Sequence, residues 1–407
     1  MEWKEVRLGD VCEIITGFPF PGKKYSKEGI RVVRGDNVTI GNLRWDTEKD
    51  KRWNEPFDKT EYYSLQANDI VIGIDGSRVG KNKARIKKED LPLLLAQRVA
   101  CVRHNELAEQ DYLYYNIFSK KFIDYVNSIH TGSAIPHISQ KQIEDYKILL
   151  PDLEMQRRIA SILSSLDRKI ELNNKINADL EEMAQAIFKN WFVDFEPFKD
   201  GKFVDSELGM IPEGWKVGCL GDMGAVVCGK TPSKSNSNYY GGDIPFIKIP
   251  DMHGNVFVES SEDRLTELGS LSQIKKLIPP YSLMVSCIAT VGLVSINTKP
   301  SHTNQQINTV IPHNKSALFY LYQYIKNNEE LLKNMGRGGT TTLNVNTRSF
   351  SNIRLLIPSE IALEQFHRVV EGLFKKIELN LHESRTLSTL RDTLLPRLMS
   401  GELEVPE

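Results

Sequence analysis

Two long stretches of the chain carry apolar residues at steps of three and four. The stretches begin after Pro151 and Pro358, and proline is tolerated at a helix start. This spacing predicts two helices that pack along an apolar seam; ordinary core packing is the alternative interpretation. The predicted seam residues are Ile159, Leu163, Leu166, Ile170, Leu180, Met183, Ile187 and Trp191 in the first stretch, and Phe366, Val370, Leu373, Ile377, Leu387, Leu390, Leu394 and Leu398 in the second.

The two stretches match each other at an offset of 207 residues. Residues 169–173 recur identically at 376–380, so each seam carries an asparagine in register, Asn173 and Asn380. A polar residue in an apolar seam commonly fixes the register of paired helices at some cost in stability. Because a long connection joins the stretches, antiparallel pairing is the simpler geometry. Helices of about 35–40 residues would form a rod about 55 Å long.

The segments outside the two stretches alternate short apolar runs with clusters of Gly, Pro and Asn. Residues 69–74 and 282–288 have the composition of short β-strands, and residues 111–127 and 318–334 look helical. This pattern predicts that each of the two segments folds as an α+β domain of many short strands.

The globular segments are repeated as well. Trp3 and Asp10 recur as Trp215 and Asp222, and weaker matches keep the same order along the chain. We interpret the chain as an internal duplication. It predicts two duplicated α+β globular domains separated by a long antiparallel two-helix coiled-coil rod, with pseudo-two-fold symmetry. The expected segments are a globular domain at 1–151, a helix at 152–192, a linker at 193–214, a second globular domain at 215–358, a second helix at 359–400 and a tail at 401–407.

Composition narrows the class of protein. The 407 residues are 40% hydrophobic and 26% charged, as in soluble globular proteins. No apolar run reaches the ~18 residues needed to span a bilayer, and the charged start resembles no signal peptide. The five cysteines form no CxxC pair, so we expect cytosolic thiols without a metal.

Catalytic motifs give near misses only. Residues 76–82 suggest a P-loop, but the GxxxxGK[ST] spacing is absent and Asn82 stands where a hydroxyl is needed. The run Ile278-Pro279-Pro280-Tyr281 resembles the tetrapeptide of amino-methyltransferases but begins with an apolar residue. HExxH and GxSxG are absent, and no reactive set occurs in both copies. The sequence therefore predicts no catalytic residues and no metal site, which favours a binding protein.

The formal net charge of −1 conceals a segregation of charge. Residues 1–151 carry 24 Lys and Arg against 22 Asp and Glu, and residues 215–358 carry 14 against 9. Residues 152–214 carry 8 against 13, and residues 359–407 carry 6 against 9. The globular segments are thus basic and the helical segments acidic, so a nucleic-acid partner is compatible with the overall charge.

Candidate DNA-binding residues lie in the basic and hydroxyl-rich runs of both copies. Arginine and lysine would contact phosphates and guanine, while amides and hydroxyls could read base edges; a solvated surface is the alternative for any single charge run. Gln97 and Gln305 are expected to brace the fold. The candidates are Lys23, Lys24, Arg34, Arg78, Lys81, Lys83, Thr131, Ser133 and His137 in the first copy, and Lys230, Thr231, Lys234, Lys248, Arg337, Thr340, Thr341 and Asn344 in the second.

The most specific motif closes the first helical stretch. Gln156-Arg157-Arg158-Ile159-Ala160 opens it, and Trp191-Phe192-Val193-Asp194-Phe195-Glu196-Pro197 ends it. With Gly214-Trp215-Lys216 and the second copy of the stretch, the chain resembles the specificity subunit of type I restriction–modification systems over essentially its whole length. Glycines that match the framework of this family are Gly17, Gly229, Gly80, Gly292, Gly132 and Gly339.

The resemblance implies two target-recognition domains, each reading one half of a split double-stranded DNA sequence. It also implies that the paired helices set the gap between half-sites and dock two modification (methyltransferase) subunits. S-adenosylmethionine would then be bound by those partners, and ATP with Mg²⁺ by restriction subunits, leaving this chain without a cofactor. A cytoplasmic, non-membrane complex is implied.

Two other classes of protein remain open at this point. The chain could be one half of a single-chain restriction–methylation enzyme, although the cofactor and tetrapeptide motifs of such enzymes are absent. It could also be a helical scaffold with no role on DNA.

Overall fold

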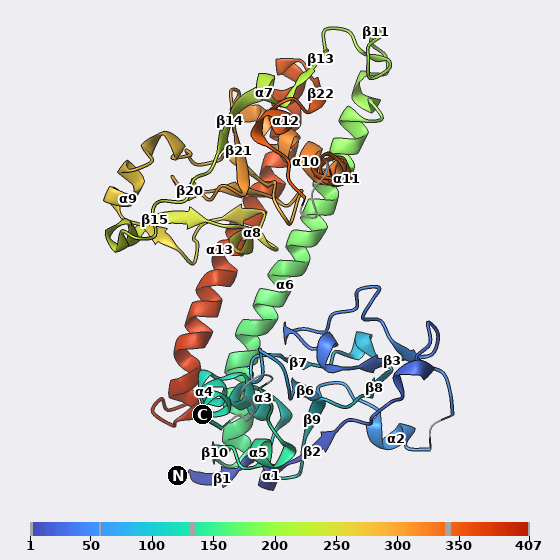
Figure 1. Ribbon diagram of the computed structural model, residues 1–407, viewed down its shortest axis with the longest axis vertical. Coiled ribbons are helices and arrows are strands. Elements are labelled where there is room, and N and C mark those ends of the chain that lie inside the picture. The colour runs from blue at the N-terminus through green and yellow to red at the C-terminus, as the bar shows by residue number, and fades with distance from the viewer. Residues whose placement is uncertain (1–2, 57, 130–135, 338–342, 406–407) are drawn as a thin grey trace. The chain divides into compact units, whose positions relative to one another are not determined.

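The computed structural model describes residues 3–56, 58–129, 136–337 and 343–405 (Figure 1). The chain divides into two compact units. Unit 1 comprises residues 1–168 and 387–407, and unit 2 comprises residues 169–386. Each unit contains one globular domain together with parts of both long helices.

The globular domain of unit 1 is built on a five-stranded sheet with the order β2-β9-β6-β7-β4 and a three-stranded sheet with the order β5-β3-β8. Neighbouring strands are antiparallel except β4 with β7 and β3 with β8. The strands are β2 (Cys12–Thr16), β3 (Ile30–Val33), β4 (Ile40–Gly41), β5 (Arg52–Trp53), β6 (Ile70–Gly73), β7 (Lys83–Arg85), β8 (Leu93–Leu95) and β9 (Val99–His104).

Helices and one further strand pair complete this domain. The first strand, β1, pairs antiparallel with β10, so the start of the domain lies beside its end. Buried side chains of α3 and α4 pack with those of the large sheet. These elements are β1 (Lys4–Arg7), β10 (Lys147–Leu150), α1 (Leu8–Val11), α2 (Thr60–Tyr63), α3 (Gln110–Phe118), α4 (Lys120–Ile129) and α5 (Gln140–Glu144).

The globular domain of unit 2 repeats this plan. Its sheets have the orders β14-β21-β18-β19-β16 and β17-β15-β20, and β13 pairs with β22 as β1 does with β10. The match confirms the predicted duplication of an α+β domain. The strands are β13 (Lys216–Cys219), β14 (Gly224–Cys228), β15 (Tyr240–Ile247), β16 (Phe257–Val258), β17 (Arg264–Leu265), β18 (Leu283–Ser286), β19 (Val294–Asn297), β20 (His302–Thr303), β21 (Ile307–Pro312) and β22 (Arg354–Ile357).

The helices of unit 2 follow the order of those of unit 1, except that the short helix α8 stands where unit 1 has the 3-10 helix Gly35–Asn37. The connection before this domain is folded as well, because it holds a two-stranded β11–β12 pair and the ring of Trp215 packs near Phe192 and Phe198. These elements are α7 (Leu220–Met223), α8 (Ile249–Met252), α9 (Glu267–Leu271), α10 (Leu318–Asn327), α11 (Glu329–Gly336), α12 (Thr347–Ser351), β11 (Phe203–Val204) and β12 (Ile211–Pro212).

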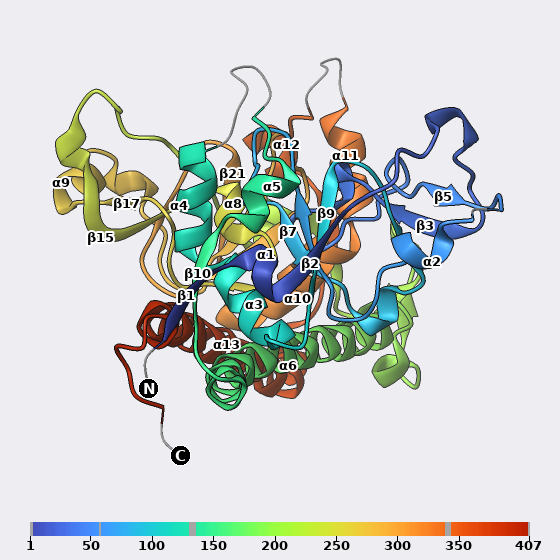
Figure 2. The same ribbon diagram turned by 90° about the horizontal axis from the view of Figure 1, so that it is seen from below.

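The two predicted long helices are α6 (Leu153–Phe192) and α13 (Glu360–Met399), each of 40 residues. In unit 2 they lie side by side (Figures 1 and 2). Lys169 of α6 pairs with Glu383 of α13 at 3.1 Å. Further along α6, Phe188 contacts Phe366, which precedes Glu383 in α13. The helices therefore run antiparallel there.

The asparagines of the predicted seam are buried between the helices of unit 2. Asn173 donates hydrogen bonds to Glu383 at 2.9 Å and to the carbonyl of Asn380 at 3.4 Å. Asn380 donates to Asn177 at 2.8 Å. Because these bonds form only in one alignment, they favour this register over a slipped one.

Two predicted seam positions lie on the surface. The side chains of Met183 and Leu390 are 52% and 45% exposed. Ala184 is fully buried in place of Met183, and Arg391, which pairs with Asp167 at 2.6 Å, occupies the inward position beside Leu390. The prediction was wrong because it favoured large apolar side chains, whereas the helical phase places a small residue and an ion-paired residue inward.

The apolar core continues from the domains into the helices. In unit 2, the ring centres of Phe188 and Phe192 each lie 4.7–6.4 Å from those of Tyr320 and Phe366. In unit 1, Leu163 and other residues of α6 pack against tyrosines of α3. Each domain is thus fixed to both long helices within its own unit. The other predicted seam residues are buried or partly buried: Ile159, Leu163, Leu166, Ile170, Leu180, Ile187, Trp191, Phe366, Val370, Leu373, Ile377, Leu387, Leu394 and Leu398.

Candidate nucleic-acid interface

Three loops of unit 1 meet at one edge of its sheets. Strands β3 and β8 are parallel, with Val33 opposite Leu95, so the chain leaves both strands at the same edge. The loop after β3 begins with Arg34, and the loop after β8 contains Arg98. The loop after β6 joins them, because the N–H of Ile74 donates to the carbonyl of Arg98 at 3.1 Å. These loops line a cavity of about 810 Å³.

The loop backbone at this cavity is held from inside the domain. Asn37 is fully buried and accepts a hydrogen bond from the N–H of Arg34 at 3.1 Å. Its amide nitrogen donates to the carbonyls of Arg44 and Lys49 at 3.0 and 2.9 Å. In the loop after β6, Gly76 has a φ of +98°, a conformation that favours glycine. Side chains therefore enter the cavity from an ordered backbone.

The cavity is basic and rich in hydrogen-bonding groups. Arg98 Nε lies 3.4 Å from Asp75, and the guanidinium of Arg34 lies 3.9 Å from Asp36 and 5.8 Å from the centre of the Tyr25 ring. Arginines outnumber aspartates here, which suits an anionic ligand. The charged and amide side chains lining the cavity are Arg34, Asp36, Arg44, Asp75, Arg78, Asn82, Gln97 and Arg98.

The equivalent edge of unit 2 carries different side chains. Strands β15 and β20 are parallel, with Ile247 opposite Thr303. Lys248 follows β15 as Arg34 follows β3, and its backbone N–H is bonded to Asp251 at 2.8 Å in the same helix-capping position. The same loop geometry thus presents a lysine in one copy and an arginine in the other.

Neighbouring groups restrain the polar side chains of this second edge. Lys248 forms an ion pair with Asp263. The hydroxyl of Thr231 donates to the exposed side chain of Gln305 at 2.6 Å. Asn304 donates to Gln306 at 3.0 Å. Hydroxyl and amide groups take the place of the arginines that line the cavity of unit 1.

One predicted DNA contact, Lys83, is buried. Only 3% of this residue is exposed, and its ammonium donates to the carbonyls of Gly80 and Ile117 at 3.0 and 2.7 Å. It also lies 5.3 and 5.1 Å from the ring centres of Phe118 and Phe122. Burial lowers the pKa of Lys83 to about 7. Lys83 therefore supports the loop after β6 from behind and is not available to DNA.

Other predicted contacts lie on the surface at varied places. Lys24 pairs with Glu55 at 2.7 Å, and Arg337 donates to Asn334 at 2.8 Å. Arg78 is exposed and lines the cavity of unit 1. The remaining exposed candidates are Lys23, Lys81, Lys230 and Lys234.

His137 and Asn344 occupy corresponding positions in the two domains. His137 forms a β-bridge with Asp75, and Asn344 forms one with Ile288. Both residues are exposed, and the bridge places His137 beside the loop after β6. The candidates Thr131, Ser133, Thr340 and Thr341 lie outside the described residues.

The sequence missed several residues that line the cavity of unit 1. Arg44, Asp75 and Arg98 are far apart in the sequence, and the pairing of β3 with β8 and of β6 with β9 brings their loops together. The sequence held one indication of Arg98, because this residue directly follows Gln97, which matches Gln305 of the second copy. The positive φ of +70° at Arg98 was not visible in the sequence.

Metal ligands do not gather anywhere in the described part of the chain. No group of three or more His, Cys, Asp or Glu side chains in this part could hold a metal ion. No helix within the described ranges is long and apolar enough to cross a membrane.

Comparison with known proteins gives the class of the chain. The family model for the type I restriction modification DNA specificity domain matches residues 1–182 and 212–387. The HindI specificity subunit from Haemophilus influenzae is 38% identical over 354 residues, which cover 72% of this chain and 77% of that protein. The MjaIX specificity subunit from Methanocaldococcus jannaschii is 32% identical over 306 residues, covering 73% and 70%.

The fold agrees with this assignment. A crystal structure of the S subunit of a type I restriction–modification system from M. genitalium matches with a TM-score of 0.58 at 14% identity, covering 98% of this chain and 96% of that one. The chain belongs to the family of type I restriction–modification specificity subunits, whose role is recognition of a DNA sequence.

Proposed function

We propose that this chain selects the DNA target of a type I restriction–modification complex and that each globular domain reads one half of a bipartite sequence. The observation that carries the proposal is the polar loop edge found on the same strand framework in both units. Two reading modules in one chain suit a target in two parts. The chain itself is not catalytic.

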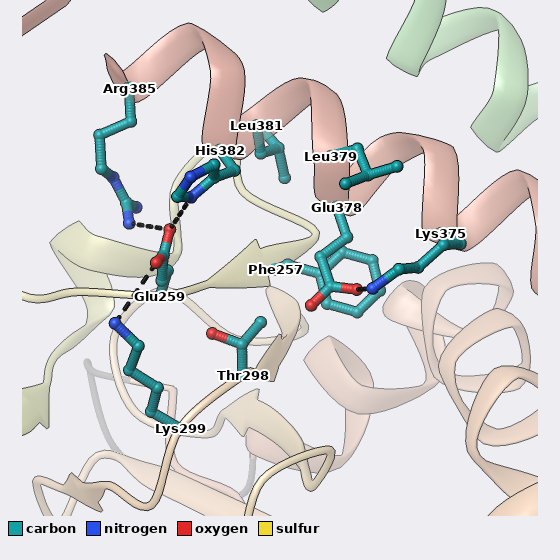
Figure 3. A pocket seen from close by; sticks show the side chains of 10 residues that line it. All are labelled: Phe257, Glu259, Thr298, Lys299, Lys375, Glu378, Leu379, Leu381, His382 and Arg385. Carbon is teal, nitrogen blue, oxygen red and sulfur yellow. Dashed lines mark hydrogen bonds and ion pairs between the residues drawn. The ribbon is translucent and has the colours of Figure 1, made fainter.

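Firm attachment of each domain to the long helices supports a role for the helices in spacing the half-sites. In unit 2, Glu259 accepts bonds from His382 and Arg385 of α13 at 3.1 and 2.8 Å, and pairs with Lys299 at 3.3 Å (Figure 3). Burial opposes ionisation of Glu259, but the hydrogen bonds and charges of these groups hold its pKa below the usual value. This polar brace restrains the domain on the helix.

Unit 1 has its own attachment. Asp167 of α6 accepts hydrogen bonds from the hydroxyl of Tyr115 at 2.7 Å and from Arg391 of α13 at 2.6 Å. Tyr112 is buried nearby and donates to the carbonyl of Leu149 at 2.6 Å. Since both domains are tied to the same two helices, the helices are suited to set the length of DNA between the half-sites.

Exposed apolar residues on the long helices are suited to bind two modification subunits. Leu172 on α6 and Leu379 on α13 are 50% and 53% exposed, and they occupy equivalent positions in the repeat. The exposed residues Met183 and Leu390 are equivalent in the same way. Each of them lies 11 residues after the leucine on its own helix, which is about three helical turns, so each helix presents the two side chains on one face. A surface that occurs twice suits a partner that binds twice.

The chemistry of the complex is assigned to partner subunits. Modification subunits would bind S-adenosylmethionine and methylate the target, and restriction subunits would use ATP with Mg²⁺ for translocation and cleavage. This assignment agrees with the sequence, in which no reactive set occurs in both copies.

The proposed function is tested by mapping methylated sites across the genome of cells with and without this gene, in the presence of the modification subunits. We expect a single bipartite sequence to lose methylation when the gene is absent. Methylation of DNA by the purified chain alone would contradict the non-catalytic assignment, and a methylation map independent of the gene would contradict the recognition role.

The spacing role is tested by deleting four residues, 174, 175, 176 and 178, from the middle of α6. The deletion shortens the helix by about 6 Å and rotates its C-terminal half by about 40°, so the spacer should change or assembly should fail. Removal of residues 205–208 from the connection between β11 and β12, outside the helix, is the control. An unchanged spacer with full activity after the helix deletion would refute the role.

A further inference from the structure

We infer that Arg34 reads a guanine in the half-site recognised by unit 1, whereas Arg78 binds a phosphate. This inference rests on the proposed function of DNA recognition and adds the residue that determines one base of the target. The globular domain of unit 1 uses its arginines in different ways.

Several arginines of unit 1 are committed to structure. Arg103 forms two bonds with Asp69, at 2.9 and 2.6 Å. Arg31 and Arg52 both bond to Asp50, at 3.0–3.4 Å. Their guanidinium groups are therefore each paired with a carboxylate of the same domain.

The guanidinium of Arg34 is used differently. Among the described residues it makes no hydrogen bond, and the ion pair with Asp36 at 3.9 Å is long. Its Nε is buried without a partner, as is Oδ1 of Asn82, which lines the same cavity. An unpaired buried polar group costs about 1–3 kcal/mol in a folded protein. These two atoms are closed off from solvent, so a ligand at the cavity would instead meet the terminal N–H groups of the partly exposed Arg34 side chain, which donate no hydrogen bond among the described residues.

Arg34 is also held in position. Its side chain is only 24% exposed, Tyr25 lies against the guanidinium with 5.8 Å to the ring centre, and the buried Asn37 fixes its backbone. A restrained arginine loses little entropy on binding, and its planar fork matches O6 and N7 of guanine, the commonest specific arginine contact in the major groove. Arg34 has the geometry of a base reader.

Arg78 and Lys248 supply the contrast. Arg78 is exposed on the loop after β6, and its guanidinium forms no hydrogen bond or ion pair within the described ranges, as suits a mobile phosphate contact. Lys248, the counterpart of Arg34 in unit 2, is neutralised by Asp263 and carries no planar fork. We therefore assign guanine reading at this loop position to unit 1 alone.

The test compares variants of the full chain assembled with its modification subunits. Arg34→Ala and Arg34→Lys are each examined by methylation mapping and by binding to duplexes with single base changes at several salt concentrations. Both variants should lose selectivity for one G·C pair in one half-site, with discrimination at that pair falling roughly 10-fold or more. Thermal unfolding is followed in parallel, because a folded variant is required for the comparison.

Two matched variants distinguish the possible outcomes. Arg78→Ala should weaken binding to all sequences alike and reduce the salt slope by about one. Lys248→Ala should leave the discrimination of the complex at this G·C pair unchanged. The inference would be overturned if Arg34→Ala weakened binding to all sequences alike, or if it left discrimination at every base pair as in the parent. Selection of a bipartite target by the parent complex would still support the proposed function.

Discussion

The globular domains of units 1 and 2 share one strand order but differ at the centre of the large sheet. In unit 1, Asp69 is 3% exposed and pairs with Arg103 of β9. At the equivalent positions unit 2 has Ser282, which donates to the carbonyl of Pro279 at 2.8 Å, and Ile311. A buried ion pair in one copy thus corresponds to a hydroxyl and an apolar side chain in the other.

The loop edges differ in the same way. Unit 1 presents several arginines around a cavity, whereas unit 2 presents hydroxyls, amides and the paired Lys248. Backbone pairing therefore preserves the fold while the side chains on that framework change.

The largest effect in this comparison is expected at the buried ion pair of unit 1. Asp69→Asn should cost about 3 kcal/mol of unfolding free energy, because it leaves the Arg103 charge in a partly buried site without its carboxylate. Ser282→Ala in unit 2 should cost only about 1 kcal/mol, the value of one hydrogen bond. Denaturant unfolding of both variants measures the difference. Equal losses would refute the contrast between the two sheet centres.

A pH-dependent difference is expected from Lys83. Its counterpart in β19 is Val294, so only unit 1 buries a titratable amine here. The pKa is lowered to about 7 in the folded state from 10.5, so between these values the unfolded chain binds a proton that the folded chain does not. Stability of unit 1 should rise with pH in this window by about 1.4 kcal/mol per pH unit.

The measurement for Lys83 is chemical unfolding at pH 7, 8 and 9. Lys83→Met should remove this rise, whatever the absolute stability of the variant. A Met variant with the parent's pH slope would show that Lys83 does not titrate in this range.

A smaller effect is expected at the brace between α13 and Glu259, the residue that directly follows β16. Glu259→Gln should cost about 1 kcal/mol, since Glu259 is partly exposed and its partners remain solvated. Its lowered pKa means that the contribution is present above pH 4.5 and is lost as pH falls through the folded-state pKa. Glu262→Gln, at an exposed glutamate nearby, is the control. A loss as large for Glu262 as for Glu259, by calorimetry, would argue against the brace.

The smallest effect on stability is expected at the exposed leucines. Leu172→Gln and Leu379→Gln should each change unfolding free energy by less than about 0.5 kcal/mol, because both side chains are already half in water. If these residues bind modification subunits, each variant should weaken assembly, as measured by analytical ultracentrifugation with those subunits. Normal assembly of the doubly substituted chain would exclude this surface as the docking site.

Much of the framework could be predicted from residues close together in the sequence. Steps of three and four follow from helix geometry, and most of the predicted seam residues are buried or partly buried in the structure. The repeated asparagines lie buried between the helices of unit 2. The phase at Met183 and Leu390 was wrong because periodicity alone does not show that Ala184 and Arg391 take the inward positions. Packing between the helices selects one of two neighbouring residues on the same helix.

The site was less predictable. Arg34 and Arg78 were recognised as basic, but so was Lys83, which the fold buries under aromatic rings. Arg98 was not selected, although its loop meets that of Arg34. Charge is a property of each residue, whereas exposure and proximity depend on strands that pair across long distances in the sequence.

Repeats and hydrophobic periodicity depend only on the order of residues along the chain. The amino-acid sequence was therefore enough to establish a duplicated α+β protein with two long helices. It also contained the motifs of the specificity-subunit family. The folded chain was needed to show which basic side chains surround one cavity, which lysine is buried and which apolar residues remain exposed on the helices. The physical reason is that the parallel pairing of β3 with β8 and of β15 with β20 brings distant loops to one edge. In unit 1 the buried Asn37 accepts a hydrogen bond from the backbone N–H of Arg34 and thereby holds the loop after β3 in place.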